Sequence, residues 1–537
     1  MAIGTLPKKT TLTSLTGRLF ARNTAFNLAG ELVAFGIGVV CIPYVVKTLG
    51  TDSFGILSIA WMLLVYMSLF DLGLTRATTK FVAEAVGGGD DHHVHSLVWT
   101  SITFQLLFGL LGTVLFLSSI HLLTSRVFKI PAPLMAEAQR GFRFLAIAVP
   151  IILVTNCLRG VLEARQQFHL INYIKVASNI LMFSSPFLLI PFGGRLSSII
   201  LLMIVLRFVA MIVYLELCLS PLRKAGHPRS FDRAVLGRLL RYGGWITVSN
   251  VTGPMLMYAD RFAIGALLSV GALAYYTGPA DMLNRALVVP ASLGSTLFPA
   301  FSSLQAVGAL EKLEDFYSRS LKYLVVVMGP PLLFIAAFAR EILTAWLGPV
   351  FAQNGAAPLR ILAISIFLSS IALIPYGLLT GAGRPDLTAK FHLIELPIHL
   401  ALTWLLVSKF GLVGAAIAVT VRVAFDTALL LWACDEVGLV SLDVVRQAGV
   451  LKSFIGLLLI SAVAFLPFVT SGTLLRRVSI VSLLCFAYLV GQWFWSFDDR
   501  DRSFSISTMR HLGRTRPPAP GAQPPSTLTP SRAVARK

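Results

Sequence analysis

Charged residues are scarce in this chain. Asp, Glu, Lys and Arg together make up 13% of its 537 residues, whereas a soluble globular protein carries about 25%. Hydrophobic residues make up 56%. So few charges cannot cover the surface of several water-soluble domains. The composition therefore excludes such domains and predicts a polytopic membrane protein.

Cysteine clusters and catalytic motifs are absent. The five cysteines lie far apart in sequence, with no CxxC pattern and no Cys/His cluster, so neither a disulfide framework nor a zinc site is predicted. The patterns GxxxxGKS, GxxxxGKT, HExxH and GxSxG do not occur. No long loop is present that could carry acid and base groups. We therefore expect a protein that is not an enzyme and has no catalytic residue, metal or cofactor.

Long apolar segments recur along the whole chain. A membrane-spanning helix needs about 20 predominantly apolar residues. Such segments predict an all-α protein of about fourteen transmembrane helices. They lie at residues 23–46, 54–72, 96–121, 142–162, 172–193, 196–219, 243–268, 284–304, 321–342, 358–381, 388–408, 411–433, 451–470 and 478–496.

Positive charge dominates, with 45 Lys and Arg against 25 Asp and Glu. In a membrane protein, Lys and Arg concentrate on the cytoplasmic side. With both termini in the cytoplasm, 29 of the 45 lie on that side, 11 lie on the other side and 5 lie within the spans. This asymmetry predicts cytoplasmic termini. It also explains the basic composition without a nucleic-acid partner.

Short patterns in the first half of the chain recur in the second half at nearly one offset. Three such matches predict the duplication of a six-helix unit. Because six is even, both copies cross the membrane in the same sense and should be related by a pseudo-twofold axis along the membrane normal, with a cavity between them. The matches are Phe54–Ile56 with Leu273–Tyr275 (offset 219), Gly160–Leu162 with Gly377–Leu379 (offset 217) and Arg207 with Arg422 (offset 215).

The repeat divides the chain into two bundles and additional segments. The last two spans fall outside the repeat and are expected to be accessory helices. The tail is rich in Arg, Pro and Ser and is predicted to be disordered. The predicted boundaries are an N-terminal bundle at 1–220, a basic cytoplasmic linker at 221–242, a C-terminal bundle at 243–437, accessory helices at 438–497 and the tail at 498–537.

Two arginines lie deep within predicted spans. Arg207 and Arg422 each stand eleven residues into a span, about 16 Å deep at 1.5 Å per residue. A charge at this depth is costly and should face a cavity or a partner. Guanidinium binds phosphate through two parallel hydrogen bonds, so both arginines are candidate anion-binding residues. The structural alternative is an ion pair between Arg422 and Asp426, four residues later.

Other polar side chains within the spans are candidate binding residues. Neighbours in a helix point apart by about 100°, so one of Asp260 and Arg261 should face the cavity. A polar stripe in the first span either lines the cavity or forms a seam between helices. Lys175 and Arg285 are weaker candidates near a membrane face. The stripe contains Asn23, Asn27 and Glu31, and Glu31 aligns with Asn250 at offset 219.

The opening third of the chain resembles the Wzx-type polysaccharide flippases of the multidrug/oligosaccharidyl-lipid/polysaccharide (MOP) exporter superfamily. The resemblance continues through the repeat to about Val437. It is specific for the superfamily rather than for a substrate. The segments that carry it are Arg22–Thr24, Thr48–Ile56, Asp71–Leu74 and Lys80–Glu84.

The resemblance implies two six-helix bundles plus two further helices. It implies transport of a polyprenyl-pyrophosphate-linked oligosaccharide from the cytoplasmic to the outer leaflet of the bacterial inner membrane, for O-antigen, capsule or exopolysaccharide synthesis. The implied partners are this anionic lipid-linked glycan and membrane lipids. Coupling to a proton or sodium gradient and contact with other polysaccharide-assembly membrane proteins are left open.

Three alternative functions remain. A cation-coupled multidrug exporter of the same superfamily predicts acidic clusters in the spans, whereas arginine dominates here. A lipid II flippase is chemically close to the leading hypothesis. A membrane polymerase or ligase would require a long outer loop, which the sequence lacks.

Overall fold

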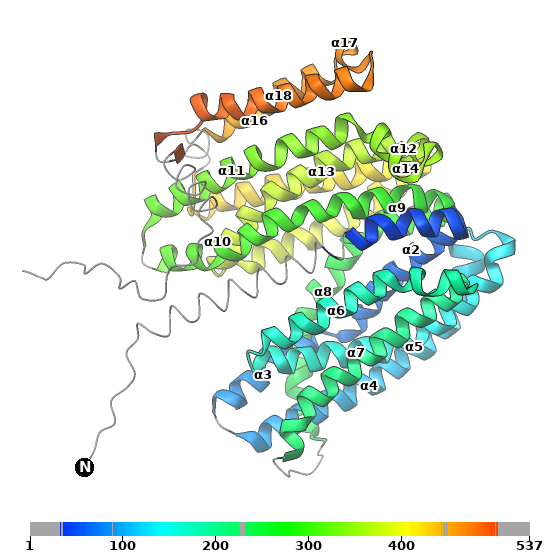
Figure 1. Ribbon diagram of the computed structural model, residues 1–537. Helices are drawn as coiled ribbons and strands as arrows, with labels where there is room; N and C mark the ends of the chain where they lie inside the picture. Colours follow the sequence, from blue (N-terminus) through cyan, green and yellow to red (C-terminus); the bar gives the residue numbers. More distant parts are fainter. Residues whose placement is uncertain are drawn as a thin grey trace, which may run out of the picture.

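The computed structural model describes most of the chain. It covers Val33, residues 36–88, 90–224, 231–306 and 308–441, Asp443, and residues 449–499 and 501–502. These residues are almost entirely helical, and no strand occurs among them. Two groups of helices are inclined to each other, and a pair of further helices lies outside the second group (Figure 1).

The N-terminal bundle contains the helices coloured blue to teal in Figure 1. A helix at Gly36–Leu49 opens the described part of this bundle. Its next crossing is broken at Leu72 and Gly73, whose φ angles of 49° and 70° are left-handed. The helices are α2 (Thr51–Tyr66), η1 (Met67–Asp71), α3 (Leu74–Gly87), α4 (Asp91–Leu122), η2 (Leu123–Val127), α5 (Ala132–Ala164), α6 (Phe168–Leu189), η3 (Ile190–Phe192) and α7 (Leu196–Lys224).

The C-terminal bundle contains the helices coloured green to yellow. Its last long helix is bent, because Gly411 has a φ of 59° and a ψ of −133°. This bend separates residues 385–410 from 412–436, as the two predicted spans require. The helices are α8 (Arg233–Leu267), α9 (Val270–Asn284), η4 (Arg285–Leu287), α10 (Val288–Ala306), α11 (Leu310–Ala337), α12 (Ala339–Leu347), α13 (Pro349–Gly381) and α14 (Pro385–Glu436).

The structure repeats its contacts as well as its helices. Helices α2 and α9 begin 219 residues apart, and α5 and α13 begin 217 residues apart. A thiol-to-carbonyl contact occurs in both bundles at equivalent places. It joins Cys218 Sγ to the Leu158 carbonyl at 3.3 Å and Cys434 Sγ to the Pro375 carbonyl at 3.8 Å. The predicted duplication is therefore present in the packing.

The two bundles meet along α2 and α9. Ser58 Oγ and Thr277 Oγ1 lie 3.0 Å apart and are 219 residues apart in sequence, so they are equivalent positions of the two repeats. Equivalent residues can touch each other only beside the axis that relates them. This contact therefore marks the pseudo-twofold axis. The helices approach closely there, because a Cβ on Gly55 would lie 1.8 Å from the Val270 carbonyl oxygen.

One predicted span is wrongly placed. The sequence predicts a span at 284–304, whereas helix already begins at Val270 and continues through Gly278 and Pro279. Neighbouring groups can satisfy the backbone acceptor that a proline leaves unpaired, so proline is tolerated inside membrane helices. Nine helices of the described residues are long and apolar enough to span a membrane, with α14 counted once. The total of fourteen stays a prediction.

Helix α8 connects the bundles. Its first turns lie in the predicted linker, where Asp232 caps the helix by accepting from the Ala234 N–H at 2.8 Å. Val235 and Leu239 are buried in a cluster with residues of α3, α4, α5 and α7. The later part of α8 packs against α14. The linker prediction is therefore wrong for residues 233–242, which are a helix that packs on the N-terminal bundle.

The accessory helices are α16 (Val450–Ala464), the short α17 (Pro467–Thr470) and α18 (Leu474–Trp495). They lie on the outer side of α11 (Figure 1). The segment after α18 is anchored there, because Asp501 is fully buried and accepts from Arg319 Nη1 at 2.5 Å and from Lys322. The prediction of disorder from residue 498 is wrong for 498–499 and 501–502. Residues 503–537 lie outside the described part.

Candidate functional site

A cavity of about 770 Å³ lies between the two bundles. The N-terminal bundle contributes lining residues from the helix at Gly36–Leu49 and from α2, α6 and α7. The C-terminal bundle contributes residues from α8, α9, η4, α10 and α12. The volume falls in the range of about 300–1,000 Å³ that is usual for ligand sites. The cavity is therefore the candidate functional site.

Cations from both bundles line this cavity. Lys175 comes from α6, Arg207 from α7, Arg261 from α8 and Arg285 from η4. Among the described lining residues, Asp281 is the single acid. These are four of the five basic residues that the sequence places within spans. The fold thus brings a formal excess of positive charge to the contact region between the bundles.

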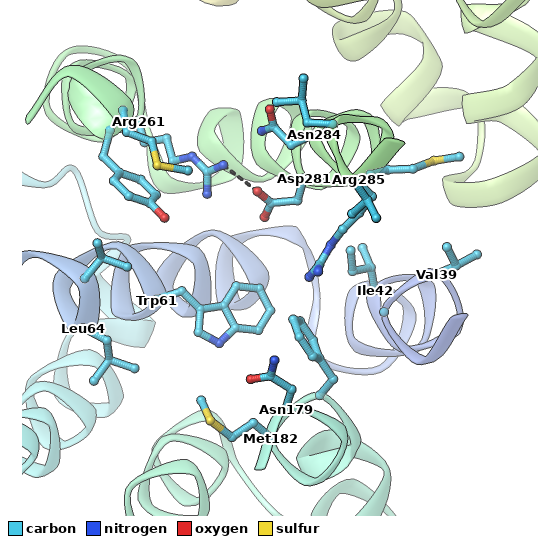
Figure 2. Close-up of a pocket in the computed structure, with 18 of the residues that line it drawn as sticks. Val39, Ile42, Trp61, Leu64, Asn179, Met182, Arg261, Asp281, Asn284 and Arg285 are labelled. Carbon is cyan, nitrogen blue, oxygen red and sulfur yellow. Dashed lines mark hydrogen bonds and ion pairs between the residues drawn. The ribbon is translucent and has the colours of Figure 1, made fainter. Parts of the chain in front are cut away.

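Arg261 is held in place by Asp281. Its Nη2 donates to Asp281 Oδ1 at 2.5 Å, and its side chain is 8% exposed. The guanidinium carbon also lies 5.0 Å from the centre of the Tyr258 ring, which favours the cation through the ring quadrupole. Figure 2 shows the arginine and the carboxylate meeting at the cavity wall, with Arg285 pointing into the same space.

Asp260 points away from the cavity, in agreement with the expected divergence of neighbours in a helix. It is buried and accepts a hydrogen bond from Tyr276 Oη at 2.6 Å and from the Arg261 backbone N–H at 2.8 Å. Asp260 is not among the lining residues. The structure therefore separates the two neighbours into a cavity residue and a packing residue.

Arg207 lies on the opposite wall, on α7. Its side chain lines the cavity, and its Nε is buried without a hydrogen-bond partner among the described residues. A buried donor without an acceptor costs about 1–3 kcal/mol. Arg207 therefore keeps hydrogen-bonding capacity for a group that is absent from the protein itself.

Arg422 does not line this cavity. Its Nη1 lies 3.7 Å from Glu395 Oε2, on the other segment of α14. The ion pair thus involves Glu395, whereas the sequence suggested Asp426 as the partner. The expectation that Arg207 and Arg422 share one cavity is not met, because the α14 bend directs Arg422 into the C-terminal bundle.

The remaining predicted residues are only partly described. Glu31, Asn27 and Asn23 lie outside the described residues, and the side chain of Asn250 in α8 is also outside them. Asp71, at the end of η1, was expected at the membrane surface. It is instead buried and accepts from Thr75 Oγ1 at 2.5 Å and from Gln105 Nε2 at 2.7 Å. It therefore joins α3 to α4.

Several lining residues were missed by the sequence analysis. Asp281 was missed because the span boundary was placed after it. The aromatic residues of the cavity had no pattern that distinguished them from other apolar positions. Trp61 and Phe183 lie 6.1 Å apart between ring centroids, and Arg285 lies 5.5 Å from the centre of Phe183. The site therefore combines cations with aromatic faces and suits an anion that carries flat, partly apolar groups.

Comparisons with known proteins agree with this site. Residues 20–305 match the family described as "Polysaccharide biosynthesis protein". The chain is 28% identical over 412 residues to the "Putative O-antigen transporter" of Shigella flexneri, covering 76% of this chain and 96% of that protein. It is 23% identical over 445 residues to the "Probable low-salt glycan biosynthesis flippase Agl15" of Haloferax volcanii, covering 81% of this chain and 89% of that protein.

A solved structure shares the fold. It is titled "Lipid II flippase MurJ, inward closed conformation" and superposes with a TM-score of 0.67 at 13% identity. The match covers 87% of this chain and 98% of that chain. At this identity the likeness concerns the arrangement of helices and not the ligand.

Proposed function

The chain belongs to the polysaccharide biosynthesis protein family, and we propose that it is a flippase for a polyprenyl-pyrophosphate-linked oligosaccharide. In this proposal the glycan lipid moves from the cytoplasmic to the outer leaflet of a bacterial inner membrane. The glycan then serves O-antigen, capsule or exopolysaccharide synthesis. The protein makes and breaks no covalent bond.

The observation that carries the proposal is the charge of the cavity. Four cations and one acid line it, and a pyrophosphate is the anionic part of the proposed substrate. Guanidinium groups bind phosphate oxygens in pairs. Arg207 has an unused buried donor for this purpose, and Asp281 fixes the direction of the Arg261 side chain.

The aromatic residues provide a second type of contact. Sugar rings present apolar C–H faces, and Trp61 and Phe183 offer flat apolar surfaces beside the cations. The polyprenyl chain would remain in the lipid outside the cavity. Rocking of the two bundles about the α2–α9 contact would expose the cavity to one side and then the other, as in transporters built from repeats.

The test is glycan export in a strain that lacks the gene and carries variants. Arg207→Ala and Arg261→Ala should each abolish export while the protein remains in the membrane. Lysine at either position should restore part of it, since the charge returns but the two-pronged donor does not. Arg340→Ala is the control, because Arg340 is exposed at α12 and does not line the cavity. Normal export by both cavity variants would exclude the anion site.

A further inference from the structure

A second polar cluster lies inside the C-terminal bundle, away from the cavity. The bend of α14 folds its two segments against each other and places Glu395 beside Arg422. The Glu395 side chain is 1% exposed. Asp426, one turn after Arg422, is within hydrogen-bonding range of Glu395. These three residues are the carboxyl cluster, and none of them lines the cavity.

The carboxyl cluster is not satisfied by its surroundings. Both carboxylate oxygens of Glu395 and the Oδ1 of Asp426 are buried without a hydrogen-bond donor among the described residues. The distance of 3.7 Å to Arg422 is an ion-pair contact but too long for a good hydrogen bond. Asp260, by contrast, receives two donors. Glu395 is thus buried and polar but lacks a partner.

A proton removes this deficit. Two ionised carboxylates cannot donate to each other, whereas a protonated one donates to its neighbour, as in paired carboxyls that share a site. The two carboxylates and one guanidinium carry a net charge of −1. One bound proton makes the cluster neutral, and a neutral group is favoured where water is excluded.

Other charged and titratable groups face the cluster from the same and neighbouring helices. His392 and His399 lie on α14 itself, and Asp260 on α8 is within electrostatic range of Arg422. Asp260 in turn has Arg261 as a neighbouring cation. Helix α13 contributes backbone carbonyls, to which Thr420 and Thr427 donate. These surroundings supply no second cation beside Glu395, so the charge of −1 is left for a bound ion.

We propose that Glu395 and Asp426 share one bound proton, and that release and rebinding of this proton accompany transport. The second half of the statement rests on the proposed flippase function. A proton suits the cluster better than a metal ion, because the guanidinium 3.7 Å from Glu395 repels a metal cation. In addition, no group of three or more His, Cys, Asp or Glu side chains placed to hold a metal occurs in the described part of the chain.

The proton itself is the probe in the first test. Infrared spectra of the full-length protein in lipid bilayers, recorded while the pH is raised, should contain a protonated-carboxyl band that disappears. Glu395→Gln and Asp426→Asn should each remove this component of the band. Glu311→Gln should keep it, because Glu311 is exposed on α11. The wild-type titration needs no variant and therefore stands even if a variant fails to fold.

Three results would overturn the proton site. They are the absence of a titrating carboxyl band in the wild type, its persistence in both cluster variants, and its loss on adding sodium chloride but not choline chloride at constant pH. The last result would identify a sodium site instead.

Coupling is tested separately by glycan export in cells. Both cluster variants should lose export at normal abundance. Full export would overturn the coupling but leave the proton site. Since the infrared test requires no glycan, failure of the flippase assignment would leave its result unchanged.

Discussion

Arg207 and Arg422 occupy equivalent positions of the two bundles, yet their surroundings differ. Arg207 lines the cavity and keeps an unpaired donor, whereas Arg422 lies beside Glu395 within its own bundle. The positions equivalent to Glu395 and Asp426 in the N-terminal bundle are Ser178 and Met211, at offsets of 217 and 215. The acids that engage Arg422 therefore have no counterpart beside Arg207.

This difference shows how a duplicated scaffold can acquire two tasks. Duplication conserves helix packing, as the paired thiol contacts of Cys218 and Cys434 demonstrate. Two substitutions next to an inherited arginine are enough to change what that arginine binds. One bundle then keeps its central cation for an external anion, and the other uses its cation to hold two carboxyl groups.

The largest effect on stability is expected for Arg422→Ala. This change leaves Glu395 and Asp426 buried without their cation, and breaking a buried ion pair costs about 3–5 kcal/mol. Combining it with Glu395→Gln removes one negative charge and should restore most of the stability. Thermal unfolding of the purified proteins measures both effects.

Arg207→Ala is the matched control for this comparison, because it removes the equivalent arginine without leaving a carboxylate behind. It should change thermal stability little. Equal destabilisation by the two alanine variants would mean that the carboxyl cluster does not depend on Arg422.

A smaller effect is expected at the contact between the repeats. Gly55→Ala would force a Cβ to within 1.8 Å of the Val270 carbonyl oxygen, so α2 and α9 must separate. Overpacking of this kind costs about 1–3 kcal/mol. Gly377→Ala is the control, since no atom lies within 4 Å of its added Cβ. Equal unfolding temperatures for the two variants would show that the bundles are not closely packed at Gly55.

The smallest effect concerns the anchor after α18. The hydrogen bond from Arg319 holds the pKa of the Asp498 carboxyl well below its usual range. A lowered pKa in the folded state stabilises the fold above the unfolded value, about 3.9, and this contribution is lost as the pH falls through the folded value. Hydrogen exchange of residues 496–502 should therefore quicken only on strong acidification. Asp498→Asn should quicken it slightly at neutral pH, because Asp501 still binds Arg319. No change in Asp498→Asn would mean that Asp501 alone holds the segment.

Much of the fold is predictable from sequence because membrane helices have strong periodic and compositional signals. Hydropathy indicated the helices, and three weak matches at offsets near 217 indicated the duplication. Depth within a span also identified Lys175, Arg207, Arg261 and Arg285 as intramembrane cations, and the fold brings these four to one cavity. Charge inside the membrane is costly, so its position is informative even without a structure.

The rest depended on contacts between distant segments. Glu395 and Arg422 stand 27 residues apart and meet only because α14 bends at Gly411. Helical spacing alone favoured Asp426 as the partner, since it is four residues from Arg422. The crossing of α8 between the bundles and the burial of Asp501 were unpredictable for the same reason. A local pattern does not show which distant surface a segment will pack against.

The different tasks of the two equivalent arginines are tested most directly by ligand binding. Undecaprenyl pyrophosphate, without its glycan, is titrated into the purified wild type, into Arg207→Ala, and into the stabilised pair Arg422→Ala with Glu395→Gln. Loss of a charge-assisted contact costs about 1.5–3 kcal/mol, so Arg207→Ala should bind about 10–100-fold more weakly. The Arg422 pair should bind nearly as tightly as the wild type. Equal weakening by both would contradict the account, because it would place both arginines on the same anion.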